Sequence, residues 1–174
     1  MTGEQHPHKR MGVVMQAIAW LILMVLLVFF FTDLLGKREN PNQSLETRYL
    51  QDGVREVVLQ RNRAGHYVAS GAINGRPVVF MLDTGATGVA IPDAVARKLE
   101  IPRGKPFATR TANGVATSYA ASLDTVSLGD IELRDVRAGI TPGLTSDQVL
   151  LGMSFLRHIE FTQRGDTLIL RQFP

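Results

Sequence analysis

The hydrophobic pattern opens with one long apolar run. Residues 12–32, GVVMQAIAWLILMVLLVFFFT, are apolar apart from Gln16 and Thr32. A bilayer core of about 30 Å needs about 20 residues of helix at about 1.5 Å each. A cleaved signal peptide has a shorter apolar region and a small-residue cleavage site, whereas TDLLGKREN follows here. A buried core helix is the other alternative, but this stretch has no polar face. We predict a retained transmembrane anchor over 12–32, after a short tail over 1–11.

The run is followed by a polar stretch without sustained periodicity. Residues 33–52, DLLGKRENPNQSLETRYLQD, contain an Asn-Pro pair and many polar side chains. We interpret them as a flexible linker, which at about 20 residues would reach roughly 25 Å. The folded domain is expected over 53–174, close to the membrane surface.

Basic residues on the two sides of the span give little help with its orientation. Lys9 and Arg10 precede it, and Lys37 and Arg38 follow it, so the positive-inside rule hardly discriminates. A short tail before a single span most often stays in the cytoplasm. We therefore expect a single-pass protein of the inner (cell) membrane, with its folded domain in the periplasm in a Gram-negative cell.

From Gly53 onward, short apolar or alternating segments are separated by turn residues. Asn74-Gly75 is a type I′ hairpin signal between two such segments, and a second Asn-Gly pair stands at 113–114. One convincing helix is predicted over 93–101 and a short helical segment over 154–158. Strands are predicted over 54–60, 66–73, 77–82, 89–92, 108–112, 115–128, 131–140, 149–151, 159–163 and 167–172. This spacing predicts an all-β domain, a small closed barrel with one or two short helices.

Composition narrows the classes of function. The chain has no cysteine, which excludes disulfides and thiolate chemistry, and its net charge of +3 is not concentrated in a basic run. No nucleic-acid partner is therefore expected. The histidines are scattered without acidic neighbours at ligand spacing. We expect no metal site and no cofactor.

A lone carboxylate ends one predicted buried strand. In VVFMLDTGATGVAIP, five apolar residues lead directly to Asp83, and Thr84, Gly85, Ala86 and Thr87 follow. Asp-Thr-Gly could be an ordinary turn, with Asp83 binding nearby amides. By chance the tripeptide occurs in a chain of this length roughly a few per cent of the time. An unpartnered carboxylate in such a place is costly and often has a chemical role.

The wider pattern resembles the retropepsin-like aspartic proteases, and specifically the bacterial members with one N-terminal span. FMLDTGAT matches the active-site loop of that family, and VLLGMSFL matches the later hydrophobic-hydrophobic-Gly element, here Leu150, Leu151 and Gly152. The resemblance covers roughly residues 60–172 and implies that Asp83 is catalytic. It implies a substrate-covering flap between the two motifs, for which Asn113 and Gly114 are the candidates, although an Asn-Gly hairpin is often merely a hairpin. Thr87 stands where retroviral members often have an acidic residue, so substrate clamping is expected to differ.

The implied chemistry needs two carboxyl groups, one ionised to activate water and one protonated to donate to the substrate carbonyl. The chain has one Asp-Thr-Gly. Asp93 is expected to start a helix, Asp124 to lie in an alternating strand, and Asp130, Asp135 and Asp166 to lie in turns. The second carboxyl group is therefore expected from Asp83 of a second copy in a C2 homodimer. The resemblance also implies that Thr84 holds the two loops together across the axis.

The leading hypothesis is thus a membrane-anchored aspartic endopeptidase acting on polypeptide substrates. The first alternative is a catalytically inactive, membrane-tethered β-barrel that binds or dimerises. The second is an unrelated β domain in which Asp-Thr-Gly is only a turn. These alternatives differ in whether residue 83 matters for cleavage and in whether the chain dimerises.

Overall fold

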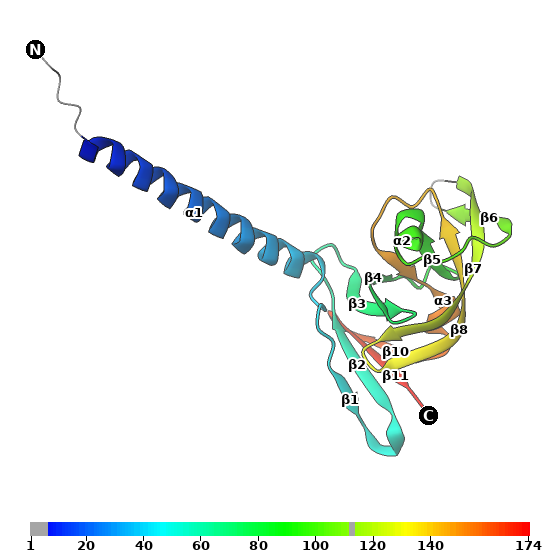
Figure 1. Cartoon of the computed structure of the whole chain (residues 1–174). Coiled ribbons are helices and arrows are strands. Elements are labelled where there is room, and N and C mark those ends of the chain that lie inside the picture. Colours follow the sequence, from blue (N-terminus) through cyan, green and yellow to red (C-terminus); the bar gives the residue numbers. More distant parts are fainter. Residues whose placement is uncertain (1–6, 112–113) are drawn as a thin grey trace, which may run out of the picture. The chain divides into compact units, whose positions relative to one another are not determined.

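The computed structural model describes residues 7–111 and 114–174 and divides the chain into two compact units (Figure 1). The first unit ends at Lys37 and the second spans Arg38–Pro174. Helix α1, Pro7–Glu39, forms nearly all of the described first unit. From Met11 on, it is long and apolar enough to cross a membrane, judged by length and composition.

The second unit is built almost entirely of strands. The predicted strands are present, with ends shifted by one or two residues, and the two predicted helices are shorter than or displaced from their expected ranges. The elements are β1 Thr47–Tyr49, the 3₁₀ turn η1 Gln51–Gly53, β2 Arg55–Gln60, β3 Tyr67–Ile73, β4 Arg76–Leu82, β5 Val89–Pro92, α2 Asp93–Lys98, β6 Pro106–Thr111, β7 Gly114–Leu128, β8 Ile131–Thr141, β9 Val149–Leu151, α3 Met153–Leu156, β10 Glu160–Arg164 and β11 Thr167–Gln172.

Six strands of the larger sheet close into a ring. The sheet order is β3-β4-β9-β5-β8-β7-β6, and β3 also pairs with β7. The closing contact joins Ala72 and Ile73 to Ser127 and Val126. Closure removes free sheet edges from the ring, and β6 extends beyond it as one arm of a hairpin with β7. The prediction of a closed all-β barrel is confirmed.

The core fills the ring and extends to the smaller sheet. Phe80, Ile91, Leu123 and Phe155 are fully buried in one continuous apolar cluster. The smaller sheet has the order β1-β2-β11-β10, and Val57 and Leu170 from its two central strands join the same cluster. Apolar burial of this extent is the main stabilising contribution to such a domain.

Residues 40–42 differ from the flexible linker that we expected. Asn42 is buried; its side-chain amide donates to the carbonyl oxygens of Gln60 (2.9 Å) and Val68 (2.7 Å), and its Oδ1 accepts from the Gln60 N–H (2.7 Å). The Asn40 side chain binds the Asn42 N–H and Ser70. These bonds fix residues 40–42 to β2 and β3. The polar residues that suggested a flexible linker instead form hydrogen bonds with backbone groups of these strands.

Candidate active site

Asp83 directly follows β4, and β9 determines its position. β4 pairs in parallel with β9 through Met81 and Leu150 and through Leu82 and Leu151. The Asp83 N–H then donates to the Leu151 carbonyl oxygen at 3.2 Å. The two motifs singled out in the sequence are therefore neighbouring strands, and the second holds the first in place.

The loop after Asp83 is a tight turn. The Gly85 N–H donates to Asp83 Oδ1 at 2.8 Å, and the Ala86 N–H donates to the Asp83 carbonyl oxygen at 3.2 Å. A Cβ at Gly85 would lie 3.1 Å from Oδ1, so a glycine lets the carboxylate approach the backbone. Asp83 is half-buried, while Thr84 and Gly85 are exposed. The loop thus presents the carboxylate at the surface of the domain.

Gly152 supports this loop from behind. A Cβ at Gly152 would lie 2.3 Å from the Gly88 carbonyl oxygen and 2.5 Å from that of Ala86. The Met153 N–H donates to the Ala86 oxygen at 2.8 Å. The backbone of α3 therefore contacts the loop directly, and this contact requires a residue without a side chain. Leu151 is buried beside Gly152, and Leu150 faces the cleft described next.

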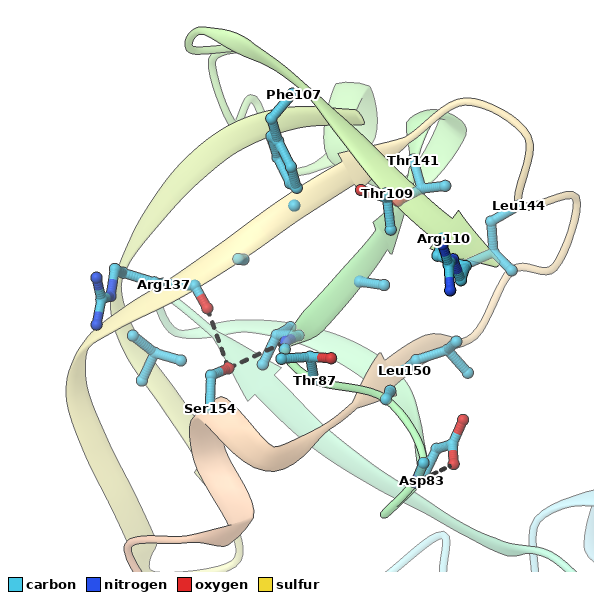
Figure 2. A pocket seen from close by; sticks show the side chains of 18 of the residues that line it. Asp83, Thr87, Phe107, Thr109, Arg110, Arg137, Thr141, Leu144, Leu150 and Ser154 are labelled. Carbon is cyan, nitrogen blue, oxygen red and sulfur yellow. Dashed lines mark hydrogen bonds between the residues drawn. The ribbon is translucent and has the colours of Figure 1, made fainter. Parts of the chain in front are cut away.

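A cleft of about 1150 Å³ opens above the loop, and Figure 2 shows Asp83 at its lower edge. Its walls come from the loop that includes Thr87, from β8, from the β6–β7 hairpin and from the segment around Leu144. Asp83 Oδ1 is occupied by the Gly85 N–H, whereas no described residue donates to Oδ2. The second carboxylate oxygen is therefore available to water or substrate.

The β6–β7 hairpin covers one side of the cleft. The ring of Phe107 packs against Gly139 of β8, where a Cβ would lie 3.0 Å from Cζ. Thr109 and Val115 also line the cleft. The Thr109 hydroxyl oxygen is buried and has no hydrogen-bond partner among the described residues. Asn113, a predicted flap residue, lies outside the described residues, and Gly114 starts β7 with φ +109°.

The sequence interpretation was wrong about Asp135 and missed the part that Ser154 plays. Asp135 was expected in a turn, but it lies inside β8 with φ 54° and lines the cleft. The left-handed conformation, which Asp tolerates better than most residues, interrupts the alternation of that strand. The Ser154 hydroxyl accepts from the Val89 N–H (3.0 Å) and donates to the Arg137 carbonyl oxygen (3.1 Å) (Figure 2). No local sequence signal marks this bridge, because its partners are far apart in the chain.

An ion-pair cluster lies at the start of α2. Asp93 binds the guanidinium groups of Arg97 and Arg103. The hydrogen bond from Arg103 is the main reason that the pKa of Asp93 is lowered, and Asp93 in turn raises the pKa of Arg103. The Arg103 guanidinium also stacks 4.7 Å from the ring centre of Tyr119 on β7. These contacts tie α2 to the base of the hairpin. Within residues 7–111 and 114–174, no group of three or more His, Asp or Glu side chains is arranged to hold a metal ion.

Comparison with known proteins identifies the family. Residues 69–158 match the family described as "gag-polyprotein putative aspartyl protease". An uncharacterized protein of Sinorhizobium is 36% identical over 124 residues, and one of Rickettsia prowazekii is 33% identical over 121 residues. These matches cover 69% and 67% of this chain, and the chain spans about half of each relative, 53% and 52% of their lengths.

A solved structure agrees with these sequence relationships. The crystal structure of a retropepsin-like aspartic protease from Rickettsia conorii superposes with a TM-score of 0.58 at 30% sequence identity. The match covers 74% of this chain and 94% of that one. The expected retropepsin-type barrel is therefore confirmed. With the family match over more than half of its length, the chain belongs to the retropepsin-like aspartic proteases.

Proposed function

We propose that the protein is a membrane-anchored aspartic endopeptidase that hydrolyses peptide bonds by using Asp83 from each of two copies. Membership of a protease family supports the reaction class. The observation that supports the site is the Asp83 carboxylate itself, which faces the cleft with Oδ2 unoccupied by any described donor. A rigid loop that holds a carboxylate at a cleft is suited to activate a water molecule.

The reaction needs a second carboxyl group close to the first. Two carboxyl groups at about 3 Å share one proton, so one can accept a proton from water while the other donates to the substrate carbonyl. Among the described residues that line the cleft, Asp135 is the other acidic side chain. It lies on β8 rather than on a second Asp-Thr-Gly loop. We assign the second carboxyl group to Asp83 of a partner chain.

A symmetric dimer is also consistent with the exposure of the loop. Thr84 and Gly85 are exposed in the single chain, so both can contact an identical loop across a two-fold axis. In this arrangement Thr84 hydrogen-bonds across the axis and Gly85 permits close approach of the two backbones. Shared anchoring in one membrane would raise the effective concentration of the two copies.

The test uses the full chain in detergent micelles and compares wild type with Asp83→Asn and Asp135→Asn. Asparagine retains an oxygen that can accept from the Gly85 N–H, so Asp83→Asn should keep the fold while peptide cleavage falls by at least about 10³-fold. Asp135→Asn should leave cleavage within a few-fold of wild type. Equal activity of wild type and Asp83→Asn would overturn the proposal. If Asp135→Asn lost activity while Asp83→Asn kept it, the proposal would have assigned the chemistry to the wrong residue.

Mixing separates a shared site from a site within one chain. After subunit exchange in a one-to-one mixture of wild type and Asp83→Asn, a shared pair predicts about one quarter of the original activity per total protein. A site complete within one chain predicts about one half. A linear dependence on the wild-type fraction would exclude the shared pair.

The membrane part of the proposal rests on α1. We propose that residues 12–32 anchor the protein in the inner membrane and that the folded unit after it, Arg38–Pro174, is a periplasmic protease domain. Alkaline carbonate washing should leave the protein in the membrane pellet. An added protease should degrade the domain in right-side-out vesicles and spare it in inside-out vesicles. The reverse protection pattern would contradict the orientation.

A further inference from the structure

The walls of the cleft carry an excess of basic side chains. Five basic residues line it, whereas the acidic residues among its described lining are Asp83 and Asp135. The basic residues are Arg110 on β6, Arg134 and Arg137 on β8, and Arg157 and His158 after α3. Arginine remains charged at any relevant pH. The cleft is therefore electropositive even when both aspartates are ionised.

Two of these guanidinium groups are available to a ligand. Arg134 forms an ion pair with Glu132 at 3.3 Å, and Arg157 Nε donates to His158 Nε2 at 3.2 Å. Within the described part of the chain, the side chains of Arg110 and Arg137 have neither a hydrogen bond nor an ion pair. Both are exposed. Each can therefore bind a carboxylate without first breaking an internal contact.

Their positions bracket the cleft. Figure 2 shows Arg137 at one end, and Arg110 near Leu144 at the other. The Arg137 backbone is fixed because its carbonyl oxygen accepts from the Ser154 hydroxyl at 3.1 Å. Arg110 is placed by the register of the hairpin, where it pairs with Val115. The two cations are thus held on separate walls rather than clustered at one point.

Apolar residues also line the cleft. Leu144 and Leu150 are among them. An acidic substrate residue beside the scissile bond would approach the Asp83 carboxylate and be repelled. Acidic residues further along the peptide would instead reach the two arginines, where guanidinium and carboxylate can form paired hydrogen bonds.

We propose that the protein selects peptides in which an apolar scissile pair is flanked by acidic residues on both sides, with Arg137 and Arg110 binding the flanking carboxylates. This inference rests on the proposed protease function and adds a substrate class to it. In the proposed dimer, the two-fold axis repeats each arginine, so both halves of an extended peptide meet the same two cations.

The experiment uses three peptides of equal length with a central Leu-Leu pair, flanked on both sides by Glu, Gln or Lys. The full chain in neutral detergent should cleave them with kcat/KM in the order Glu, Gln, Lys, with about tenfold between the Glu and Gln peptides. Salt should reduce the preference, because exposed charges are screened. A Glu peptide that is cleaved no faster than the Gln peptide would overturn the proposal.

Variants assign the preference to particular residues. Arg137→Gln and Arg110→Gln should each reduce the Glu-to-Gln ratio of kcat/KM several-fold, and the double variant should bring it close to one. Arg164→Gln makes the same change in net charge at an exposed position at the end of β10, and it should leave the ratio at the wild-type value. A decrease of the same size in Arg164→Gln would show that net charge, rather than the two cleft arginines, sets the preference.

Binding separates failure of this inference from failure of the proposed function. Fluorescence anisotropy with the Asp83→Asn protein measures affinity for the three peptides without any cleavage. Tighter binding of the Glu peptide, reduced when Arg137→Gln is added to Asp83→Asn, would support the charge selection even if wild type cleaves nothing. Cleavage by wild type together with equal affinity for all three peptides would leave the protease function standing and refute the selection.

Discussion

Gly152 and Ala86 are in backbone contact: a Cβ on Gly152 would lie 2.5 Å from the Ala86 carbonyl oxygen. That oxygen also accepts the Met153 N–H at 2.8 Å. The two residues belong to motifs that lie far apart in the chain, and their contact holds the loop that begins at Asp83. The position of the catalytic candidate therefore depends on a residue outside its own motif.

Gly152→Ala should disturb the loop more than the barrel. The added methyl group meets backbone oxygens of Ala86 and Gly88, which cannot rotate away. We expect a loss of about 1–3 kcal/mol in unfolding free energy and a loss of activity of about 10²-fold, since small misplacements of reacting groups are costly. Urea unfolding and peptide cleavage measure the two effects.

The control for Gly152→Ala is Gly143→Ala. Its new methyl group would have no heavy atom within 4 Å, so its unfolding free energy should stay within about 0.5 kcal/mol of wild type. Equal stability of the two variants would show that the contact behind the loop does not constrain it.

Ser154→Ala should destabilise the domain by about 1–3 kcal/mol. The hydroxyl accepts from the part-buried Val89 N–H, which is left without that partner after the change. The same change releases the Arg137 carbonyl oxygen. Thermal unfolding would report the loss, and Ser44→Ala, at an exposed position, should change little. A Ser154→Ala protein as stable as Ser44→Ala would contradict the bridging role.

The lowered pKa of Asp93 predicts that part of the folding stability depends on pH. The Arg103 hydrogen bond lowers its pKa in the folded state below the ordinary value of 3.8. The unfolded state therefore binds the proton more readily. The stabilisation that Asp93 provides is present above pH 3.8 and is lost as the pH falls through the pKa of Asp93 in the folded state. Asp93→Asn should be less stable than wild type at neutral pH, and the difference should shrink below pH 3.8.

Urea unfolding between neutral and strongly acidic pH measures this difference. Asp147→Asn changes an exposed aspartate and should follow the wild-type curve. A stability gap between wild type and Asp93→Asn that stays constant over the whole range would rule out the linkage. High salt should narrow the gap at neutral pH, because the cluster is partly open to solvent.

At position 100, glycine should give a more stable protein than alanine, whereas alanine is the more stabilising of the two residues at most helical positions. Glu100 follows α2 with φ 58°, and the bonds from Ile101 N–H to the Ala96 oxygen (2.9 Å) and from Glu100 N–H to the Arg97 oxygen (3.1 Å) form a Schellman motif. A side chain in this conformation costs about 1 kcal/mol. Glu100→Gly should therefore be more stable than Glu100→Ala by about that amount in urea unfolding.

The comparison of Glu100→Gly with Glu100→Ala removes the effect of the exposed ion pair between Glu100 and Arg76, because both variants lack it. Alanine equal to or better than glycine would indicate that the left-handed conformation is not retained in solution.

The sequence was informative where the signal is local. The apolar run into Asp83 predicted a strand that ends at that residue, and Asn74-Gly75 predicted the turn between β3 and β4, in which both residues have positive φ. The alternation of short segments predicted the strands themselves. These signals depend on residues within a few positions of one another.

Long-range contacts were not predictable in this way. Asn42 binds Gln60 and Val68, and nothing in a polar linker indicates which distant backbone groups it satisfies. Asp135 was assigned to a turn although the predicted strand over 131–140 includes it, and its positive φ inside β8 is not visible in the sequence. The charge of the cleft was also hidden, since Arg110 and Arg137 line the same cleft only in the folded sheet that contains β6 and β8.

The smaller sheet is formed within one chain, so folding should not require the dimer that cleavage is proposed to need. Both terminal strand pairs, β1-β2 and β10-β11, meet within one chain through the β2–β11 pairing. All four strands of this sheet therefore come from one chain, and the core that the sheet shares with the barrel is built within that chain. Dilution of the proposed dimer should then switch off cleavage at a concentration where circular dichroism is unchanged, unlike obligate dimers, in which dissociation and unfolding coincide.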